Sequence, residues 1–560
     1  MVKEYVRIVV KEDCTGCQTC DVACKQEHGL PVGLRWTQVL PDGPREIDGR
    51  LRLRYSVKDC KHYNRPPCQE ACPAGVDAYG YISLISQGKF SEALEVLRRT
   101  MPFAGVCGRV CTHPCELVCE RGKVDAPVAI RWLKRFMADY ELKVGRKRAS
   151  PIEKTKEDKV AIIGSGPAGL ACAYDVARKG YPVTVFEAAP KSGGLLRYAL
   201  PEYRLPDKIL DNEISYIEEL GVEIKTGTPI TNLKDIFNKG YKAVFLAVGV
   251  QESLKIGVEG EDTKGVINAL DLLKQVKSGM RPGLGARVIV IGGGNSAMDA
   301  ARVSLRLGAK EVHLVCLESR DLTSKDGMLA EASEIEEAEE EGLIIHPCLG
   351  PRKILSKDGK FTGVETVVCT SVREEDGTFA PKYTEYPAQT IEGDTLIVAI
   401  GQKAEVTAFG EVEKTLQGTI KANEFSLETN ISGVFAGGDA VSGPVDVITA
   451  IAAGKEAAIS IDRYLRRLDL SEGRPPTAKR VRRVSTGKVI ERTRHTMPLL
   501  KPQERVNSFA EVALGFDEKT AIEEAKYCFT CGVCMGRLDS GVKPACAVAC
   551  SARCIHFDKV

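Results

Sequence analysis

Cysteine runs at the two ends of the chain have the spacing of iron–sulfur ligands. The first run gives Cys14-x2-Cys17-x2-Cys20-x3-Cys24. Such a run gives three thiolates to one [4Fe–4S] cluster and its fourth thiolate to a neighbouring cluster. Each of two clusters would lack ligands unless the C-terminal cysteines supplied them. We therefore assign one cluster to Cys14, Cys17, Cys20 and Cys550, and the other to Cys531, Cys534, Cys546 and Cys24. This predicts a ferredoxin-like α+β module made from both chain ends, and electron transfer as its chemistry.

The distribution of the 21 cysteines favours clusters over two alternatives. Eleven lie between Cys14 and Cys119 and six between Cys528 and Cys554, whereas the long middle has ordinary globular composition. A disulfide scaffold would be short and rich in cysteine throughout. Pairs of the form C-x2-C also bind structural zinc, so a zinc-binding protein is the alternative from another class. Three closely spaced thiolates with a distant fourth suit an iron–sulfur cube better than a zinc tetrahedron.

Length and charge narrow the class of protein further. A chain of 560 residues suggests roughly three or four domains. The formal net charge of +2 gives no support for a nucleic-acid or membrane-surface role. No apolar run approaches the ~18 residues that span a bilayer, and the N-terminus has no signal-peptide cleavage pattern. We expect a cytoplasmic enzyme.

A glycine pattern beginning at Gly164 predicts a dinucleotide site. Gly164-x-Gly166-x-x-Gly169 follows the apolar run KVAII and precedes a helical stretch. Glycines at these positions let a pyrophosphate approach the amide groups at the helix N-terminus, where the helix dipole favours negative charge. Glu187 ends the next apolar run about 20 residues later, where a carboxylate can hold ribose hydroxyls.

A second pattern of the same kind begins at Gly292. Gly294 and Ala297 complete it, and Glu318 stands at the end of the following apolar run. A carboxylate there can accept from a free 2′-hydroxyl and would repel a 2′-phosphate. This favours NADH, with NADPH as the alternative because basic residues follow closely.

Two dinucleotide sites in one chain suit a flavoenzyme that holds FAD in the first site and a nicotinamide nucleotide in the second. Gly438 and Asp439 follow a late apolar run, where a carboxylate suits the ribityl chain of a flavin. Short Val/Ile runs alternate with helical stretches from 158 to about 465, which implies parallel sheets. The acidic stretch 333–342 and the basic stretch 466–515 are expected to face solvent.

The expected fold is therefore α/β, with two Rossmann-like domains, one inserted in the other, after an α-helical iron–sulfur domain. The segments in chain order are 1–40 (ferredoxin module, first half), 41–150 (helical iron–sulfur domain), 156–283 (FAD domain, first part), 284–395 (NAD(H) domain), 396–465 (FAD domain, second part), 466–522 (extended connector) and 523–560 (ferredoxin module, second half).

The stretches CQEACPAGVDAYGYI, GSGPAGLACAYDVARKGYPVTVFE and GGGNSAMDAAR resemble the family of the glutamate synthase small (beta) subunit and the N-terminal half of dihydropyrimidine dehydrogenase. This resemblance implies FAD at Gly164, Gly166, Pro167, Ala168, Gly169, Glu187, Gly194, Leu195, Arg204, Gly438, Asp439 and Thr449. It implies a nicotinamide nucleotide at Gly292, Gly293, Gly294, Asn295, Ser296, Ala297, Glu318, Ala399 and Gly401.

The same resemblance implies two further clusters in the helical domain, each one ligand short here. Their cysteines are Cys60, Cys68 and Cys119 for one, and Cys72, Cys111 and Cys115 for the other. This chain has Tyr63 and Lys134 where relatives have ligands. Cys107 could complete the second cluster, and His62 or a cysteine such as Cys528 the first.

The two chain ends resemble a different family, the iron–sulfur subunits of molybdenum and tungsten oxidoreductases. Together the two resemblances predict an electron-transfer subunit of a hetero-oligomer that relays electrons between NADH, FAD and clusters to or from a protein partner, with a tungsten or molybdenum aldehyde oxidoreductase as one candidate. A stand-alone NAD(P)H:ferredoxin oxidoreductase and a glutamate-synthase-type small subunit are the alternatives. Hydride transfer requires no side-chain acid or base, so no catalytic residue is assigned.

Overall fold

The computed structural model describes residues 5–9, 38–47, 50–58, 66–123, 125–472, 493–528 and 555–559, and it gives the backbone alone for the strands before residue 60 and after residue 550. Nine of the predicted cluster ligands lie outside the described residues: Cys14, Cys17, Cys20, Cys24, Cys60, Cys531, Cys534, Cys546 and Cys550.

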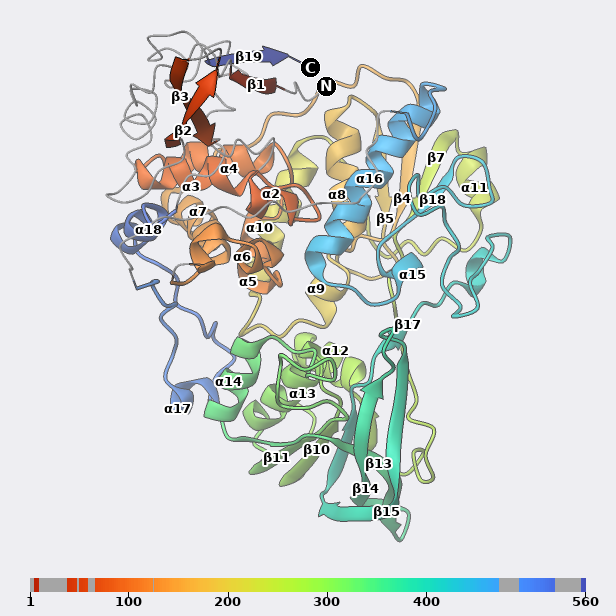
Figure 1. Ribbon diagram of the computed structural model, residues 1–560. Coiled ribbons are helices and arrows are strands. Elements are labelled where there is room, and N and C mark those ends of the chain that lie inside the picture. Colours follow the sequence, from red (N-terminus) through yellow and green to blue (C-terminus); the bar gives the residue numbers. More distant parts are fainter. Residues whose placement is uncertain are drawn as a thin grey trace.

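A parallel five-stranded sheet of order β18-β7-β4-β5-β6 forms the first nucleotide domain (Figure 1). Its central strands are largely apolar, and after Lys159 every residue of the first two is buried, as is usual for strands covered on both faces. The strands are β4 (Lys159–Ile163), β5 (Val183–Phe186), β6 (Glu223–Lys225), β7 (Tyr241–Leu246) and β18 (Val434–Ala436). The helices are α8 (Pro167–Arg178), α9 (Leu195–Tyr198), α10 (Asp207–Glu219), α11 (Leu233–Asn238), η3 (Thr407–Phe409), α15 (Asp439–Ser442) and α16 (Val447–Leu465).

A second parallel sheet of order β12-β11-β10-β16-β9 forms the other nucleotide domain. The first sheet takes strand β18 from beyond this domain, so the second domain is inserted in the first, as predicted. Its strands are β9 (Val266–Asn268), β10 (Arg287–Ile291), β11 (Glu311–Val315), β12 (Leu343–His346) and β16 (Thr395–Val398), and its helices are α12 (Ala269–Lys277), α13 (Asn295–Arg306) and α14 (Ala332–Glu340).

An antiparallel sheet packs beside the second domain, and a short strand pair joins the two domains (Figure 1). The sheet consists of β13 (Leu349–Lys357), β14 (Lys360–Arg373) and β15 (Phe379–Glu392). The joining pair is β8 (Glu252–Ser253) with β17 (Gln402–Lys403), which lie on the outgoing and returning chain.

The cysteines of residues 66–144 lie in helices, most of them short, and in the turns between them. Helix α4 buries Phe90, Ala93, Leu94 and Leu97, a spacing that places one apolar stripe against the core. The elements are α2 (Pro67–Glu70), α3 (Ala78–Ser86), α4 (Phe90–Arg98), α5 (Ala104–Val110), α6 (Pro114–Leu117), η2 (Glu120–Lys123) and α7 (Ile130–Val144). Late in the chain, α18 (Glu518–Ala525) packs against α3 and α7, whereas α17 (Pro502–Arg505) lies beside α14 of the second nucleotide domain (Figure 1).

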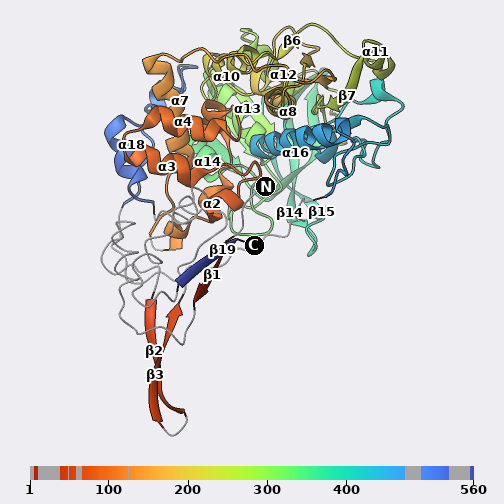
Figure 2. The same cartoon turned by 90° about the horizontal axis from the view of Figure 1, so that it is seen from above.

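The first and last described strands of the chain pair with each other. Strand β1 (Tyr5–Val9) runs antiparallel to β19 (Ile555–Lys559), with Tyr5 opposite Lys559. Strands β2 (Gln38–Ile47) and β3 (Arg50–Lys58) form a hairpin on the same side of the molecule (Figure 2). The two ends therefore meet, as the ferredoxin-like module requires, and the module itself stays a prediction because its cysteines lie outside the described residues.

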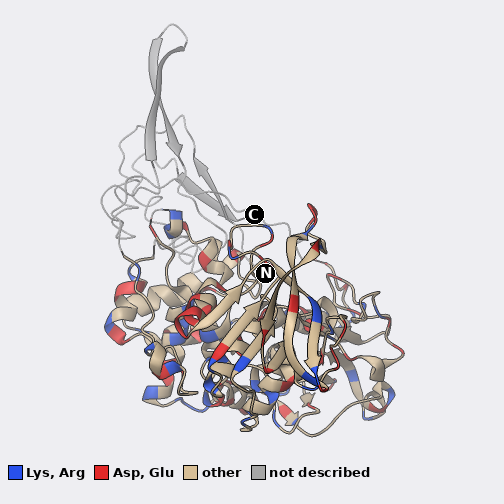
Figure 3. Ribbon diagram, turned by 90° about the horizontal axis from the view of Figure 1, so that it is seen from below, with Lys and Arg blue, Asp and Glu red and all other residues tan. Residues whose placement is uncertain are grey.

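Acidic and basic residues are mixed along the described helices and strands, in keeping with the small net charge (Figure 3). In the described part of the chain, no helix is long and apolar enough to cross a membrane.

The expectation that residues 333–342 and 466–515 face solvent is wrong at several positions. Glu334 and Glu341 are buried and pair with Arg302. Arg505 is buried and pairs with Glu340 at 2.7 Å. These charges hold elements together because each finds a partner that composition alone does not reveal.

Candidate dinucleotide and iron–sulfur sites

The first glycine loop is shaped by the residues that surround it. Gly164 has φ +104°, and a Cβ there would collide with the carbonyl oxygen of Ala247. A Cβ on Gly169 would collide with the carbonyl oxygen of Gly164. Gly166 is different, because it has φ −68° and nothing lies within 4 Å of the position of its Cβ. The open space at this N-terminus of α8 fits a pyrophosphate.

Glu187 closes the loop at the end of strand β5. One carboxylate oxygen accepts from the backbone N–H of Ser165 at 3.0 Å and from its hydroxyl at 2.5 Å. The Ser165 hydroxyl oxygen in turn accepts from the N–H of Gly193 at 2.9 Å. Gly194, with φ +55°, lies so close that a Cβ would press on the Cα of Gly166. The structure thus brings the predicted FAD residues Gly164–Gly169, Glu187 and Gly194–Leu195 together.

Gly438 and Asp439 meet the same loop from the C-terminal part of the domain. A Cβ on Gly438 would lie 3.0 Å from the Cβ of Ala168. Burial raises the pKa of Asp439 to about 6. Thr449 lies in the first turn of α16, where its N–H donates to the carboxylate of Asp446 at 3.0 Å. Asp446 was missed from the sequence, although Asp followed three residues later by Thr just before an apolar run is a recognisable helix start.

Arg204 makes its ion pairs across the boundary between the two nucleotide domains. Its guanidinium pairs with Asp299 at 2.7 Å and with Glu334 at 3.0 Å, both in the second nucleotide domain. Tyr203 beside it donates to the same Asp299 carboxylate at 3.3 Å. The structure therefore places Arg204 in a buried charge network between the two domains.

The second glycine loop repeats the design of the first. Gly292 has φ +137°, and a Cβ there would collide with the carbonyl oxygen of Ala399. Gly294 precedes α13 with φ −99° and nothing within 4 Å of its Cβ position. Asn295 accepts from the N–H of Glu331 at 3.1 Å. Ser296 and Ala297 follow in the first turn of α13, and Gly401 has φ +116° just beyond Ala399.

Glu318 faces this loop. Its carboxylate lies so close to Gly293 that a Cβ added there would displace it. Burial raises the pKa of Glu318, and the charge of Arg373 acts in the opposite direction. A carboxylate at the end of β11 and beside the glycine loop is where ribose hydroxyls of a bound dinucleotide would lie.

Four cysteines of the helical domain gather around one lysine. Cys72, Cys107, Cys111 and Cys115 are all buried, and Lys134 is 3% exposed. Burial acts to lower the pKa of Lys134, but interactions with these four cysteines outweigh it and raise the pKa. A Cβ on Gly108 would collide with the backbone of Arg135, so α5 and α7 touch beside Cys107 and Lys134. The donor set fits a four-thiolate cluster, with Lys134 as a nearby positive charge.

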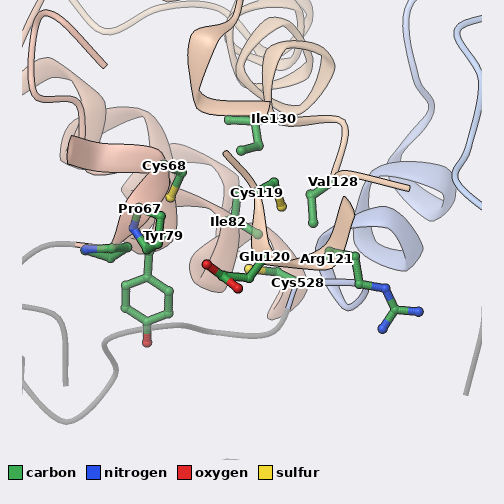
Figure 4. A pocket seen from close by; sticks show the side chains of 11 residues that line it. Pro67, Cys68, Tyr79, Ile82, Cys119, Glu120, Arg121, Val128, Ile130 and Cys528 are labelled. Carbon is green, nitrogen blue, oxygen red and sulfur yellow. The ribbon is translucent and has the colours of Figure 1, made fainter. Parts of the chain in front are cut away.

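Two other predicted ligands, Cys68 and Cys119, line a separate pocket together with Cys528 (Figure 4). Burial raises the pKa of the Cys119 thiol, and backbone N–H groups of Val128, Arg121 and Gly122 oppose this. Among the residues that the structure describes, no group of three Cys, His, Asp or Glu side chains is close enough to hold a single metal ion.

The helix that carries Cys107 begins on a carboxylate of the first nucleotide domain. Glu213 of α10 accepts from the N–H groups of Gly105 and Val106, the latter at 3.0 Å. Burial raises the pKa of Glu213 to about 7, against the effect of these two donors. The contact fixes the cysteine helix α5 on the FAD domain.

The loop that follows α5 touches both nucleotide domains. The hydroxyl of Thr112 donates to Asp446 at the start of α16. Arg131 donates to the carbonyl oxygen of Cys111 at 3.2 Å and to Glu331 at 2.8 Å. Since the N–H of Glu331 also donates to Asn295, Arg131 and Glu331 connect Cys111 to the second glycine loop. These residues had no signal in the sequence.

The fold and these sites define a flavin- and nicotinamide-dependent oxidoreductase with an iron–sulfur domain. Residues 158–454 match the pyridine nucleotide-disulphide oxidoreductase family, and residues 54–146 match dihydropyrimidine dehydrogenase domain II, 4Fe-4S cluster. The chain belongs to the pyridine nucleotide-disulphide oxidoreductase family and carries a 4Fe-4S domain in addition. Its resident cofactors include FAD and at least one [4Fe–4S] cluster.

The chain is similar in sequence to three curated relatives that are oxidoreductase subunits. The chain is 38% identical over 513 residues to the beta subunit of an NADP(+)-dependent formate dehydrogenase from Moorella thermoacetica (84% of this chain, 71% of that one). It is 34% identical over 432 residues to the glutamate synthase [NADPH] small chain of Escherichia coli (72% and 90%). It is 34% identical over 405 residues to the NAD-dependent dihydropyrimidine dehydrogenase subunit PreT of E. coli (71% and 91%).

Proposed function

We propose that the chain is the electron-transfer subunit of a larger oxidoreductase and relays electrons between NADH, FAD and iron–sulfur clusters. The observation that carries this proposal is the position of the Cys111 loop, which contacts α16 through Thr112 and the second glycine loop through Arg131 and Glu331. The bound cofactors would supply the chemistry, namely hydride transfer for the nicotinamide and flavin and one-electron transfer for the clusters.

The protein's own residues position and shield these groups. The glycine loops and their helix N-termini would hold the pyrophosphates, and Glu187 and Glu318 the riboses. Buried cysteines would exchange their thiol protons for iron, because only the thiolate is a ligand. No side chain needs to transfer a proton at the reacting atoms.

A second catalytic protein is the expected partner. All three relatives compared above carry subunit or chain names, and one belongs to a formate dehydrogenase. The resemblance of the chain ends to subunits of molybdenum and tungsten oxidoreductases points in the same direction. The test is purification of the tagged full chain from its own cells, with FAD, iron, sulfide and bound polypeptides measured. A large partner with a pterin-bound metal supports the proposal, whereas an isolated chain active with ferredoxin would contradict it.

Glu318 is expected to make NADH the preferred nucleotide. Relatives named for NADP and for NAD both occur, so membership of the family does not fix the nucleotide, and we assign the choice to the side chain at position 318. Replacing Glu318 with Gln removes the charge that holds a 2′-hydroxyl and repels a 2′-phosphate. We expect the ratio of kcat/KM for NADH over NADPH to fall about 10- to 100-fold, the value of one charged hydrogen bond.

The matched control is Glu311→Gln, at the exposed start of the same strand β11, which should leave the ratio unchanged. Reduction of a viologen dye at varied nucleotide concentration gives both constants. Wild-type enzyme that prefers NADPH would show this assignment to be wrong.

A further inference from the structure

The pocket formed by Cys68, Cys119 and Cys528 joins parts of the chain that are distant in sequence (Figure 4). Cys68 belongs to α2, Cys119 directly precedes η2, and Cys528 follows α18 near the C-terminus. The rest of the lining is largely apolar and includes Ile82 and Val128. Three thiols around one apolar pocket form a donor set of the kind that binds an iron–sulfur cluster.

Cys528 is held in this position by contacts of helix α18 and Tyr527, which precede it. The buried carboxylate of Glu524 accepts from the N–H of Ala129 at 2.7 Å and from the N–H of His495 at 3.0 Å. The guanidinium of Arg121 lies over the ring of Tyr527, 4.1 Å from its centroid. Helix α18 is therefore fixed to the start of α7 and to the residues beside Cys119, so the approach of Cys528 to the pocket is built into the fold.

We propose that Cys528 is a thiolate ligand, with Cys68 and Cys119, of an iron–sulfur cluster in this pocket. It supplies the thiolate that Tyr63 cannot, and it comes from outside residues 54–146, which match the 4Fe–4S domain family. This inference rests on the proposed function, because it assumes that the chain carries clusters for electron transfer.

The position of Cys528 also has a consequence for the electron path. Cys531, the first cysteine of the C-terminal run, is three residues later in the sequence. Three residues of chain span at most about 11 Å. One short segment would thus ligate both the cluster of this pocket and a cluster of the ferredoxin-like module, which keeps the two close whatever the conformation between them.

The test compares full-length variants Cys528→Ala, Cys68→Ala and the double variant, with Cys348→Ala as a control. Cys348 is a half-buried cysteine of the second nucleotide domain, far from the pocket in sequence. The measurements are iron and sulfide per chain, the EPR spectrum after reduction with dithionite, and FAD per chain. We expect each single variant to lose about four iron atoms and one EPR signal, with FAD retained.

The double variant should lose no more iron than either single variant, because both cysteines serve one cluster. Iron loss that adds up in the double variant, or a Cys528→Ala protein with the full iron content, would overturn the inference. Wild-type protein without iron would instead contradict the proposed function itself. FAD retention in every variant shows that the nucleotide domains have folded.

Discussion

Replacing Gly166 with valine is expected to abolish FAD retention while the chain still folds. The backbone at Gly166 has φ −68°, which any residue can adopt, and no atom lies within 4 Å of the added Cβ. The side chain would therefore fill the space at the N-terminus of α8 that the pyrophosphate needs. Loss of two charged hydrogen bonds costs about 3 kcal/mol or more, which weakens binding over 100-fold.

Gly294→Val is the counterpart of this variant in the second loop. Gly294 has the same open surroundings before α13, with φ −99°. We expect it to keep FAD and to raise the KM for NADH by a similar factor. The pair thus separates the two sites: one variant loses the flavin and the other loses the nicotinamide nucleotide.

Gly283→Val serves as the control, because Gly283 lies outside both loops and also has nothing within 4 Å of its Cβ position. FAD is measured by its absorbance after denaturation, and folding by the melting temperature. A Gly166→Val protein with full FAD content would show that the first loop does not hold the dinucleotide.

Local patterns made the glycine loops predictable. Each loop needs particular residue types at fixed spacing, so Gly164–Gly169, Glu187, Gly292–Ala297 and Glu318 could be chosen from the sequence, and the structure brings each set together. The topology was also predictable, since alternation of strands and helices implies parallel sheets.

Contacts between segments could not be predicted in this way. The pairing of the Arg204 guanidinium with Asp299 and Glu334 of the other domain had no signal in the sequence. The contact of Thr112 with Asp446 depends on how two domains pack. A sequence pattern reports the local backbone and is silent on which distant charge will be buried against it.

The acidic stretch on α14 is the clearest example of charges that are buried against a distant partner, and replacing that partner, Arg302, should lower the melting temperature strongly. Arg302 of α13 is completely buried and pairs with Glu334 at 2.7 Å, Glu337 at 2.8 Å and Glu341 at 2.7 Å. Replacing Arg302 with Met leaves these carboxylates crowded without their shared cation. Breaking a buried pair in this way costs about 3–5 kcal/mol, so we expect the melting temperature to fall by about 10 °C or more.

Arg320→Met is the matched control. Arg320 pairs with Glu339 of α14 at 2.7 Å, but both side chains are about 40% exposed. An exposed pair of this kind contributes about 1 kcal/mol or less, so the melting temperature should change little. Calorimetry of the holo-protein compares the variants by their midpoints, because a chain of several domains does not unfold in two states.

The effect of Arg302→Met should also depend on pH. Although burial acts in the opposite direction, Arg204 and Arg302 hold the pKa of Glu334 low, and Arg306 and Arg302 do the same for Glu341. A lowered carboxylate pKa stabilises the fold above the unfolded-state pKa, and this stabilisation is lost as the pH falls through the folded-state pKa. Without Arg302 the buried carboxylates bind protons more readily, which relieves their repulsion in the variant as the pH falls. The difference in melting temperature between wild type and variant should therefore narrow from pH 7.5 to pH 5. A gap that widens on acidification would mean that α14 is held to α13 by packing and not by these charges.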